Sequence, residues 1–92
     1  MRGEMVEEER QSIINRLNRI EGQVKGIRKM IEEEQDCSEI LMQVAAVKAA
    51  VNKVGTLVFQ THFRRCLEAA VRGEQDYAFV DDAMKMLAKY IG

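Results

Sequence analysis

The sequence predicts an all-α protein, and three observations support this prediction. The 92 residues contain no proline, and only 5% are aromatic, whereas sheet proteins favour aromatic side chains. Strong helix formers such as Ala, Met, Glu, Lys and Arg are abundant. Apolar residues recur at alternating spacings of four and three, which is the repeat of packed helices. The length allows one domain, residues 1–92.

The first helix is expected over about residues 7–33. Its apolar positions keep the alternating spacing until an acidic run at 32–36 ends the pattern. These positions are Ile13, Leu17, Ile20, Val24, Ile27 and Ile31.

The second helix is expected over residues 37–72. Asp36 suits the N-cap position, and Gly73 suits the left-handed residue that ends many helices. Gly55 is a weak point inside the helix. At 1.5 Å per residue, this helix would be about 50 Å long. Its apolar positions are Ile40, Val44, Val47, Val51, Val54 and Val58.

A third helix is expected over about 76–90, from the spacing of Phe79, Ala83 and Leu87. Three helices of such unequal length cannot enclose a core around the long one. The long helix therefore needs a partner for its free apolar face. An antiparallel homodimer is the simplest closed arrangement that supplies one.

The charges are segregated along the chain, although the net charge is only −1. Residues 10–29 carry six basic side chains against Glu21 alone, and residues 40–67 carry four without any acid. Two basic stretches of this kind are suited to neutralise DNA phosphates. Ordinary solvated helix faces are the alternative explanation.

The composition argues against several classes of protein. One small helical core leaves little room for an enclosed pocket, so we expect no enzyme. No stretch approaches the roughly 20 apolar residues of a membrane span, and the acidic residues 1–10 are unlike a signal peptide. We therefore expect a cytoplasmic protein without a membrane partner. In that compartment cysteines are thiols, metal ligands or redox sensors.

The single histidine and both cysteines fall on the second helix. His62 and Cys66 are four residues apart and share one face. Cys37 lies about 37 Å from His62 along an unbroken helix, so the three cannot meet within one chain. In an antiparallel dimer, Cys37 would face His62 and Cys66 of the partner. Two thiolates and one imidazole suit monovalent copper, and the alternative is a structural histidine beside a buried thiol.

Two segments and the ligand pattern resemble the copper-sensitive operon repressors, the CsoR family. The segments are RLNRIEGQVKGI at 16–27 and DCSEILMQVAAVK at 36–48, and the pattern is Cys37, His62 and Cys66. The resemblance covers about residues 10–90. It implies helical dimers that pair into homotetramers and repress transcription without metal. Copper(I), bound by Cys37 of one subunit and His62 and Cys66 of the other, would release them from double-stranded operator DNA.

The resemblance also implies residues that support the metal site. Copper sensors often carry a tyrosine before the first cysteine and a glutamate in the third helix. Asp36 takes the first place here, and Asp81 or Asp82 takes the second. Nickel- or cobalt-sensing relatives use extra histidines, and residues 1–20 contain none.

For the DNA-binding face, the resemblance and the local charge give two sets of residues. The resemblance implies basic positions on the first and second helices, and local charge alone adds two lysines. The first set is Arg16, Arg19 and Lys53, and the second is Lys25 and Lys48. Without a recognisable helix-turn-helix, readout is expected through phosphate contacts and DNA shape.

Two other functions compete with a copper-responsive repressor. A repressor of the same fold that senses persulfide or redox state would join Cys37 and Cys66 through sulfur. A small cytosolic copper-buffering protein is the alternative from another class. The basic stretches argue against it, because a metal carrier has no need of them.

Overall fold

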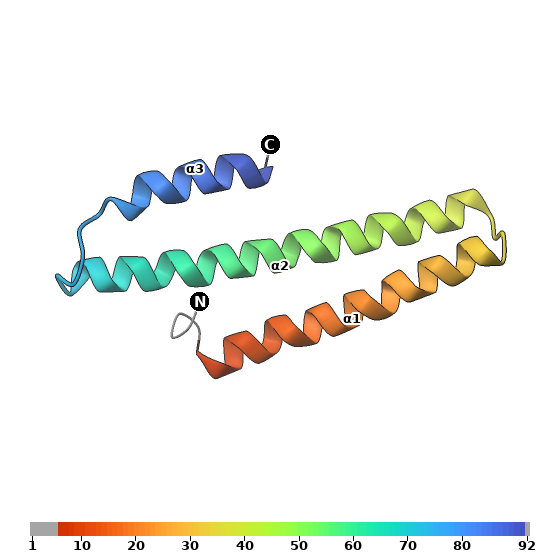
Figure 1. Cartoon of the computed structure of the whole chain (residues 1–92), viewed down its shortest axis with the longest axis horizontal. Coiled ribbons are helices and arrows are strands. Elements are labelled where there is room, and N and C mark those ends of the chain that lie inside the picture. Colours follow the sequence, from red (N-terminus) through yellow and green to blue (C-terminus); the bar gives the residue numbers. More distant parts are fainter. Residues whose placement is uncertain (1–5, 92) are drawn as a thin grey trace.

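The computed structural model describes residues 6–91 as three helices joined by two turns. The helices are α1 (Glu7–Glu32), α2 (Cys37–Val71) and α3 (Phe79–Ile91). α1 runs antiparallel to α2 along one side, and α3 turns back along the other side (Figure 1). The all-α fold with a long central helix is therefore confirmed. Of the single domain expected over 1–92, residues 1–5 and 92 lie outside the described residues.

Both turns are built on a residue with a left-handed backbone. These residues are Glu34, with φ of 54°, and Gly73, with φ of 78°. In each turn, the backbone N–H of this residue and that of the next residue donate to carbonyls of the preceding helix at 2.9–3.0 Å, which satisfies acceptors at the helix end. Glycine adopts this backbone without steric cost. For Glu34, the clash of the side chain with the backbone costs roughly 1–2 kcal/mol.

The start of α2 agrees with the sequence prediction, and the start of α3 corrects it. The Asp36 side chain accepts a hydrogen bond from the Ser38 backbone at 3.2 Å and caps α2. α3 begins at Phe79 and not near residue 76. The reason is that the Asp76 side chain accepts from the Ala78 N–H at 3.0 Å. This local bond holds 76–78 in a turn that competes with the helix.

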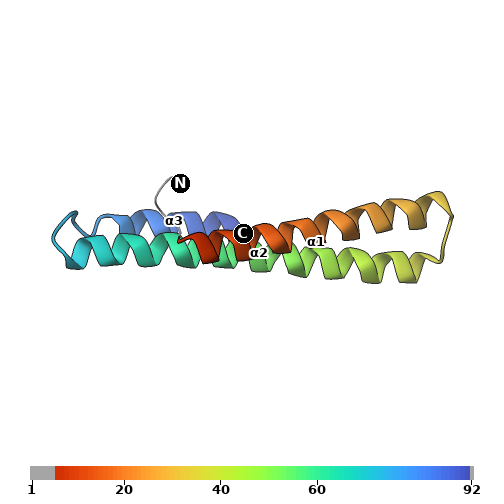
Figure 2. The same cartoon turned by 90° about the horizontal axis from the view of Figure 1, so that it is seen from below.

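The three helices lie in a single layer (Figure 2). The chain measures 57 × 29 × 14 Å, and its smallest dimension is little more than the roughly 10–12 Å diameter of one helix. Domains normally bury their cores between two layers. In keeping with the single layer, no large side chain in the described part of the chain is fully buried.

The apolar seams of α1 and α2 are covered on one side only. Along α1, Ile13 and Ile20 are buried, whereas Leu17 and Val24, half a repeat away, are 44% and 49% exposed. The same alternation runs along α2, where one set is half-buried and the other exposed. The half-buried set is Ile40, Val47 and Val54, and the exposed set is Val44 and Val51. One apolar position of each repeat packs within the chain, and the other is exposed on the surface of the single chain.

By length and composition alone, α2 also meets the requirements of a membrane-crossing helix. Its best 18-residue window has a mean hydropathy of 1.2, and none of that window is buried within the chain. The expectation that no segment is this apolar is too strict, because valine and alanine dominate the helix around Lys48 and Lys53. A helix that contacts another subunit has the same property when one chain is considered alone. We therefore expect the uncovered seam to contact another chain.

Replacing Glu34 with glycine is expected to stabilise the protein by about 1 kcal/mol, because it removes the left-handed strain. It also removes a negative charge from the C-terminal end of α1, where the helix dipole disfavours it. Urea denaturation at fixed protein concentration measures the change. Gly73→Ala is the matched control and should cost about 1 kcal/mol, since its φ of 78° is also left-handed. Equal stability of all three proteins would contradict this account of the turns.

Placing a charge in the uncovered seam is expected to break the assembly. Val51→Asp puts a carboxylate in the middle of the exposed apolar row on α2. Sedimentation equilibrium at micromolar concentration should show dimers or larger species for the wild type and monomers for this variant. Val71→Asp, at an exposed position outside the seam, should leave assembly unchanged. A monomeric wild-type protein would refute the assignment.

Candidate metal centre and nucleic-acid face

His62 and Cys66 lie side by side near the end of α2 and offer one imidazole and one thiol as candidate metal ligands. Both side chains are half-buried, and Nε2 of His62 lies 3.6 Å from Sγ of Cys66. Metal–nitrogen and metal–sulfur bonds of about 2.0 and 2.3 Å give an N···S separation of about 3.5–3.8 Å around one ion. The observed distance fits this separation. The pair is therefore suited to hold one metal ion together.

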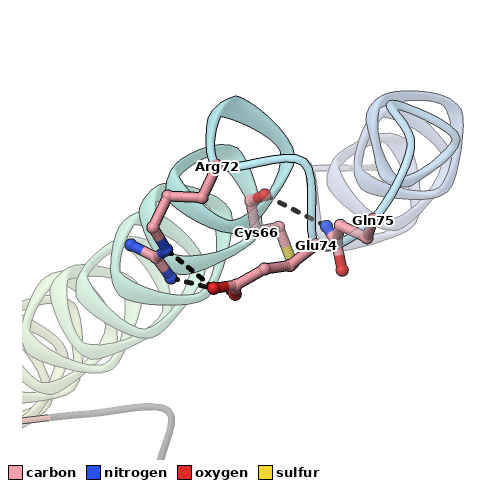
Figure 3. A network of polar contacts seen from close by, with 4 residues as sticks. All are labelled: Cys66, Arg72, Glu74 and Gln75. Carbon is pink, nitrogen blue, oxygen red and sulfur yellow. Dashed lines mark hydrogen bonds and ion pairs between the residues drawn. The ribbon is translucent and has the colours of Figure 1, made fainter.

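The turn between α2 and α3 forms one wall of this site. A hollow of about 230 Å³ is lined by His62, Arg65, Cys66, Ala69, Arg72, Glu74 and Gln75. Gln75 donates from Nε2 to the carbonyl oxygen of Cys66 at 3.0 Å (Figure 3). In the same turn, the Arg72 guanidinium donates twice to the Glu74 carboxylate, at 3.1 and 3.2 Å, and lowers the pKa of that carboxyl. Gln75 could not be identified from the sequence, because a single contact from a turn has no spacing that marks it.

Cys37 lies at the opposite end of α2 and is exposed. The adjacent Asp36 is also exposed, and its carboxylate accepts from the hydroxyl and the backbone N–H of Ser38. The Ser38 hydroxyl, followed by its backbone N–H, lowers the pKa of Asp36. The capping carboxylate is therefore ionised at neutral pH, beside the thiol.

Within one chain, the three predicted ligands do not come together. α2 is unbroken from Cys37 to Val71, so its length keeps Cys37 away from His62 and Cys66 (Figure 1). Among residues 6–91, no three His, Cys, Asp or Glu side chains are grouped so that they could hold a metal ion. Any site that uses all three ligands needs a second chain.

Asp81 and Asp82 are both exposed on the first turn of α3. Their negative charges lie at the helix N-terminus, where the helix dipole stabilises them. This position explains two acids at the start of α3 without a metal. Their support of the site stays a prediction.

The predicted DNA-binding residues lie on the surfaces of α1 and α2. Arg16 is half-buried and Arg19 exposed, and both line a shallow hollow of about 480 Å³ along α1. Arg16 and Lys53 each lie 16 residues from the turn that joins the two antiparallel helices. With an equal rise per residue, they stand at about the same level along the chain. Lys25, Lys48 and Lys53 are exposed.

The chain matches one family of regulatory proteins over most of its length. A family model described as "metal-sensitive transcriptional repressor" matches residues 5–89. The copper-sensing transcriptional repressor CsoR of Bacillus subtilis is 39% identical over 84 residues, which cover 88% of this chain and 83% of that protein. The copper-sensing transcriptional repressor RicR of Mycobacterium tuberculosis is 38% identical over 64 residues, which cover 70% of this chain and 67% of that protein.

Two solved structures share the fold. The copper-sensing repressor CsoR with Cu(I) from Geobacillus thermodenitrificans NG80-2 has a TM-score of 0.83 and 33% identity, covering 96% of this chain and 92% of its own. The nickel-responsive transcriptional regulator InrS has a TM-score of 0.78 and 32% identity, covering 87% and 90%. Since sequence and structure agree over nearly the whole chain, the protein belongs to the family of metal-sensitive transcriptional repressors.

Proposed function

We propose that this repressor responds to copper(I): it binds double-stranded operator DNA without metal and leaves the DNA when copper binds. The observation that carries the proposal is the arrangement of ligands on α2. His62 and Cys66 are 3.6 Å apart near one end of the helix, and Cys37 lies at the other end. The relatives named as copper sensors support the same choice. As a member of a repressor family, the protein is not an enzyme.

Two chains that pair through their uncovered seams complete the site. In an antiparallel pair of α2 helices, the first turn of one helix lies beside the last turns of the other. Cys37 of one subunit then joins His62 and Cys66 of its partner, and two-fold symmetry builds the site twice. Two such dimers form the homotetramer.

Copper(I) fits this ligand set better than other metals. Thiolates and imidazole are soft or intermediate ligands, whereas magnesium and calcium prefer oxygen. Zinc usually takes a fourth ligand. The chain has one histidine, so the nitrogen-rich site typical of nickel cannot form from its side chains. This separates the chain from its nickel-responsive structural neighbour.

Release from DNA requires the metal to distinguish two packings of the assembly. Copper shifts the equilibrium only if it binds the DNA-free packing more tightly. The linkage is reciprocal, so operator DNA must weaken copper binding by the same factor. On DNA, Arg16, Arg19 and Lys53, together with Lys25 and Lys48, neutralise phosphates. Such a protein acts in the cytoplasm, where the operator is.

Mixing two defective variants tests whether the metal site is shared. Cys37→Ala and Cys66→Ala should each lose tight copper(I) binding, measured by competition with a chromogenic chelator. After the two are mixed, unfolded and refolded together, half of the dimers are hybrid, and each hybrid holds one intact site. About a quarter of the wild-type capacity should therefore return. Ligands drawn from one chain would give no recovery.

The His62→Ala variant separates copper sensing from thiol sensing. Loss of imidazole should weaken copper binding and abolish copper-induced operator release. Operator release by a persulfide donor that survives in His62→Ala, with no response of the wild type to copper(I), would instead favour a sulfur sensor.

Removing the predicted phosphate-binding side chains should weaken operator binding and reduce its dependence on salt. Arg16→Ala and Lys53→Ala should each flatten the slope of log affinity against log salt by about 1, because each variant neutralises one phosphate fewer. Fluorescence anisotropy with labelled operator at several salt concentrations measures both effects. Lys85→Ala removes the same charge from an exposed position on α3 and should change neither. Unchanged slopes for Arg16→Ala and Lys53→Ala would refute the DNA-binding face.

A further inference from the structure

α3 touches α2 at points that adjoin the candidate functional residues. The turn before α3 contacts Cys66 itself through Gln75, at 3.0 Å. The ring of Phe79 packs edge-on against Phe63, which follows His62, with ring centres 5.4 Å apart. The hydroxyl of Tyr90 donates to the carbonyl oxygen of Asn52, which precedes Lys53, at 2.8 Å.

Gly55 gives a second observation that Tyr90 is seated on α2. A Cβ at this position would overlap the hydroxyl oxygen of Tyr90, so any side chain here would displace the ring. The Asn52 carbonyl also accepts from the hydroxyl of Thr56, on the same helix, at 3.1 Å. This side-chain donor comes in addition to the backbone hydrogen bond of the helix. A glycine in the interior of a long helix costs about 1 kcal/mol relative to alanine. Close docking of Tyr90 is the structural reason for it.

α3 therefore spans the distance between two candidate functional parts of α2. One is the pair His62 and Cys66, and the other is the turn that carries Lys53. The helix α3 starts beside the metal ligands and runs back along α2 toward the middle of that helix (Figure 1). Between these two ends, Ala83 is buried. A shift of the turn that lines the candidate metal site would be transmitted along this one helix to the turn of α2 that carries Lys53.

We propose that Gln75 and Tyr90 are positioning residues that link the metal site to the DNA-binding part of α2 through α3. Gln75 fixes the first end of the link on Cys66, and Tyr90 fixes the second end on Asn52. Metal binding at His62 and Cys66 moves the turn held by Gln75, and Tyr90 carries that movement to the backbone next to Lys53. This inference rests on the proposed function, because it concerns how copper binding reaches the DNA face.

The quantity that tests the link is the ratio of operator affinities without and with copper(I). Tyr90→Phe keeps the ring and removes the donor to Asn52. Gln75→Leu keeps the neutral charge and much of the side-chain volume and removes the donor to Cys66. Each should reduce the ratio by about 5-fold, the change that corresponds to one hydrogen bond. Operator affinity of the metal-free protein should stay within about 2-fold of the wild type in both variants, and copper affinity of the free protein should do so in Tyr90→Phe, which lies away from the metal site.

Two further variants make the test specific. Tyr77→Phe removes a hydroxyl that makes no hydrogen bond to the described residues, and it should leave the ratio unchanged. Gly55→Ala displaces Tyr90 without weakening the helix and should reproduce the effect of Tyr90→Phe.

The results separate this inference from the proposed function. A wild-type ratio near one refutes the proposed function itself. A normal wild-type ratio that is unchanged in Tyr90→Phe, Gln75→Leu and Gly55→Ala refutes the link alone. Weaker copper binding with an unchanged ratio also refutes it, because the residues would then support only the metal site.

Discussion

A single layer of helices cannot bury both sides of its apolar seam, and this constraint governs the whole molecule. The chain is 14 Å thick, so α1 covers one set of apolar positions on α2 and leaves Val44 and Val51 exposed. Exposed apolar rows on such a scale are stable in water only when another surface covers them. We therefore expect this row to lie against another chain. The proposed metal site and DNA face depend on the same contact.

The unbroken length of α2 determines where a site with all three predicted ligands can form. An unbroken helix holds Cys37 apart from His62 and Cys66, so the proposed three-ligand site can form only between two chains. A shared site reports on how two chains pack, which a site within one chain would not do. In the proposed dimer, each subunit would supply Cys37 to one site and the pair His62 and Cys66 to the other, so one helix length would set the spacing of both sites.

Periodicity in the sequence predicted the helices, because burial along a helix repeats every three or four residues. Their ends depend on single hydrogen bonds, and the bond from Ala78 to Asp76 moved the start of α3 to Phe79. The heptad pattern also could not show which apolar positions stay uncovered, since both sets look alike in sequence. In the site, spacing and chemical softness predicted His62 and Cys66 as a pair. Gln75 and Tyr90 make individual contacts, which leave no pattern in the sequence. Gly55 was predicted to be a weak point of the helix, because the residue that packs against it, Tyr90, lies 35 residues away in sequence.

Assembly alone cannot explain release from DNA. Copper at the proposed shared site would bind the paired chains and not the separate ones, so it would favour the assembled form. Operator DNA that contacts basic residues of more than one subunit would favour the assembled form as well. Two ligands that stabilise the same state strengthen each other's binding, which is the opposite of release. Negative coupling must therefore come from a change of packing inside the intact assembly. α3 contacts both functional parts of α2 and is held to them by few bonds, so it is the element of the chain best placed to make that change.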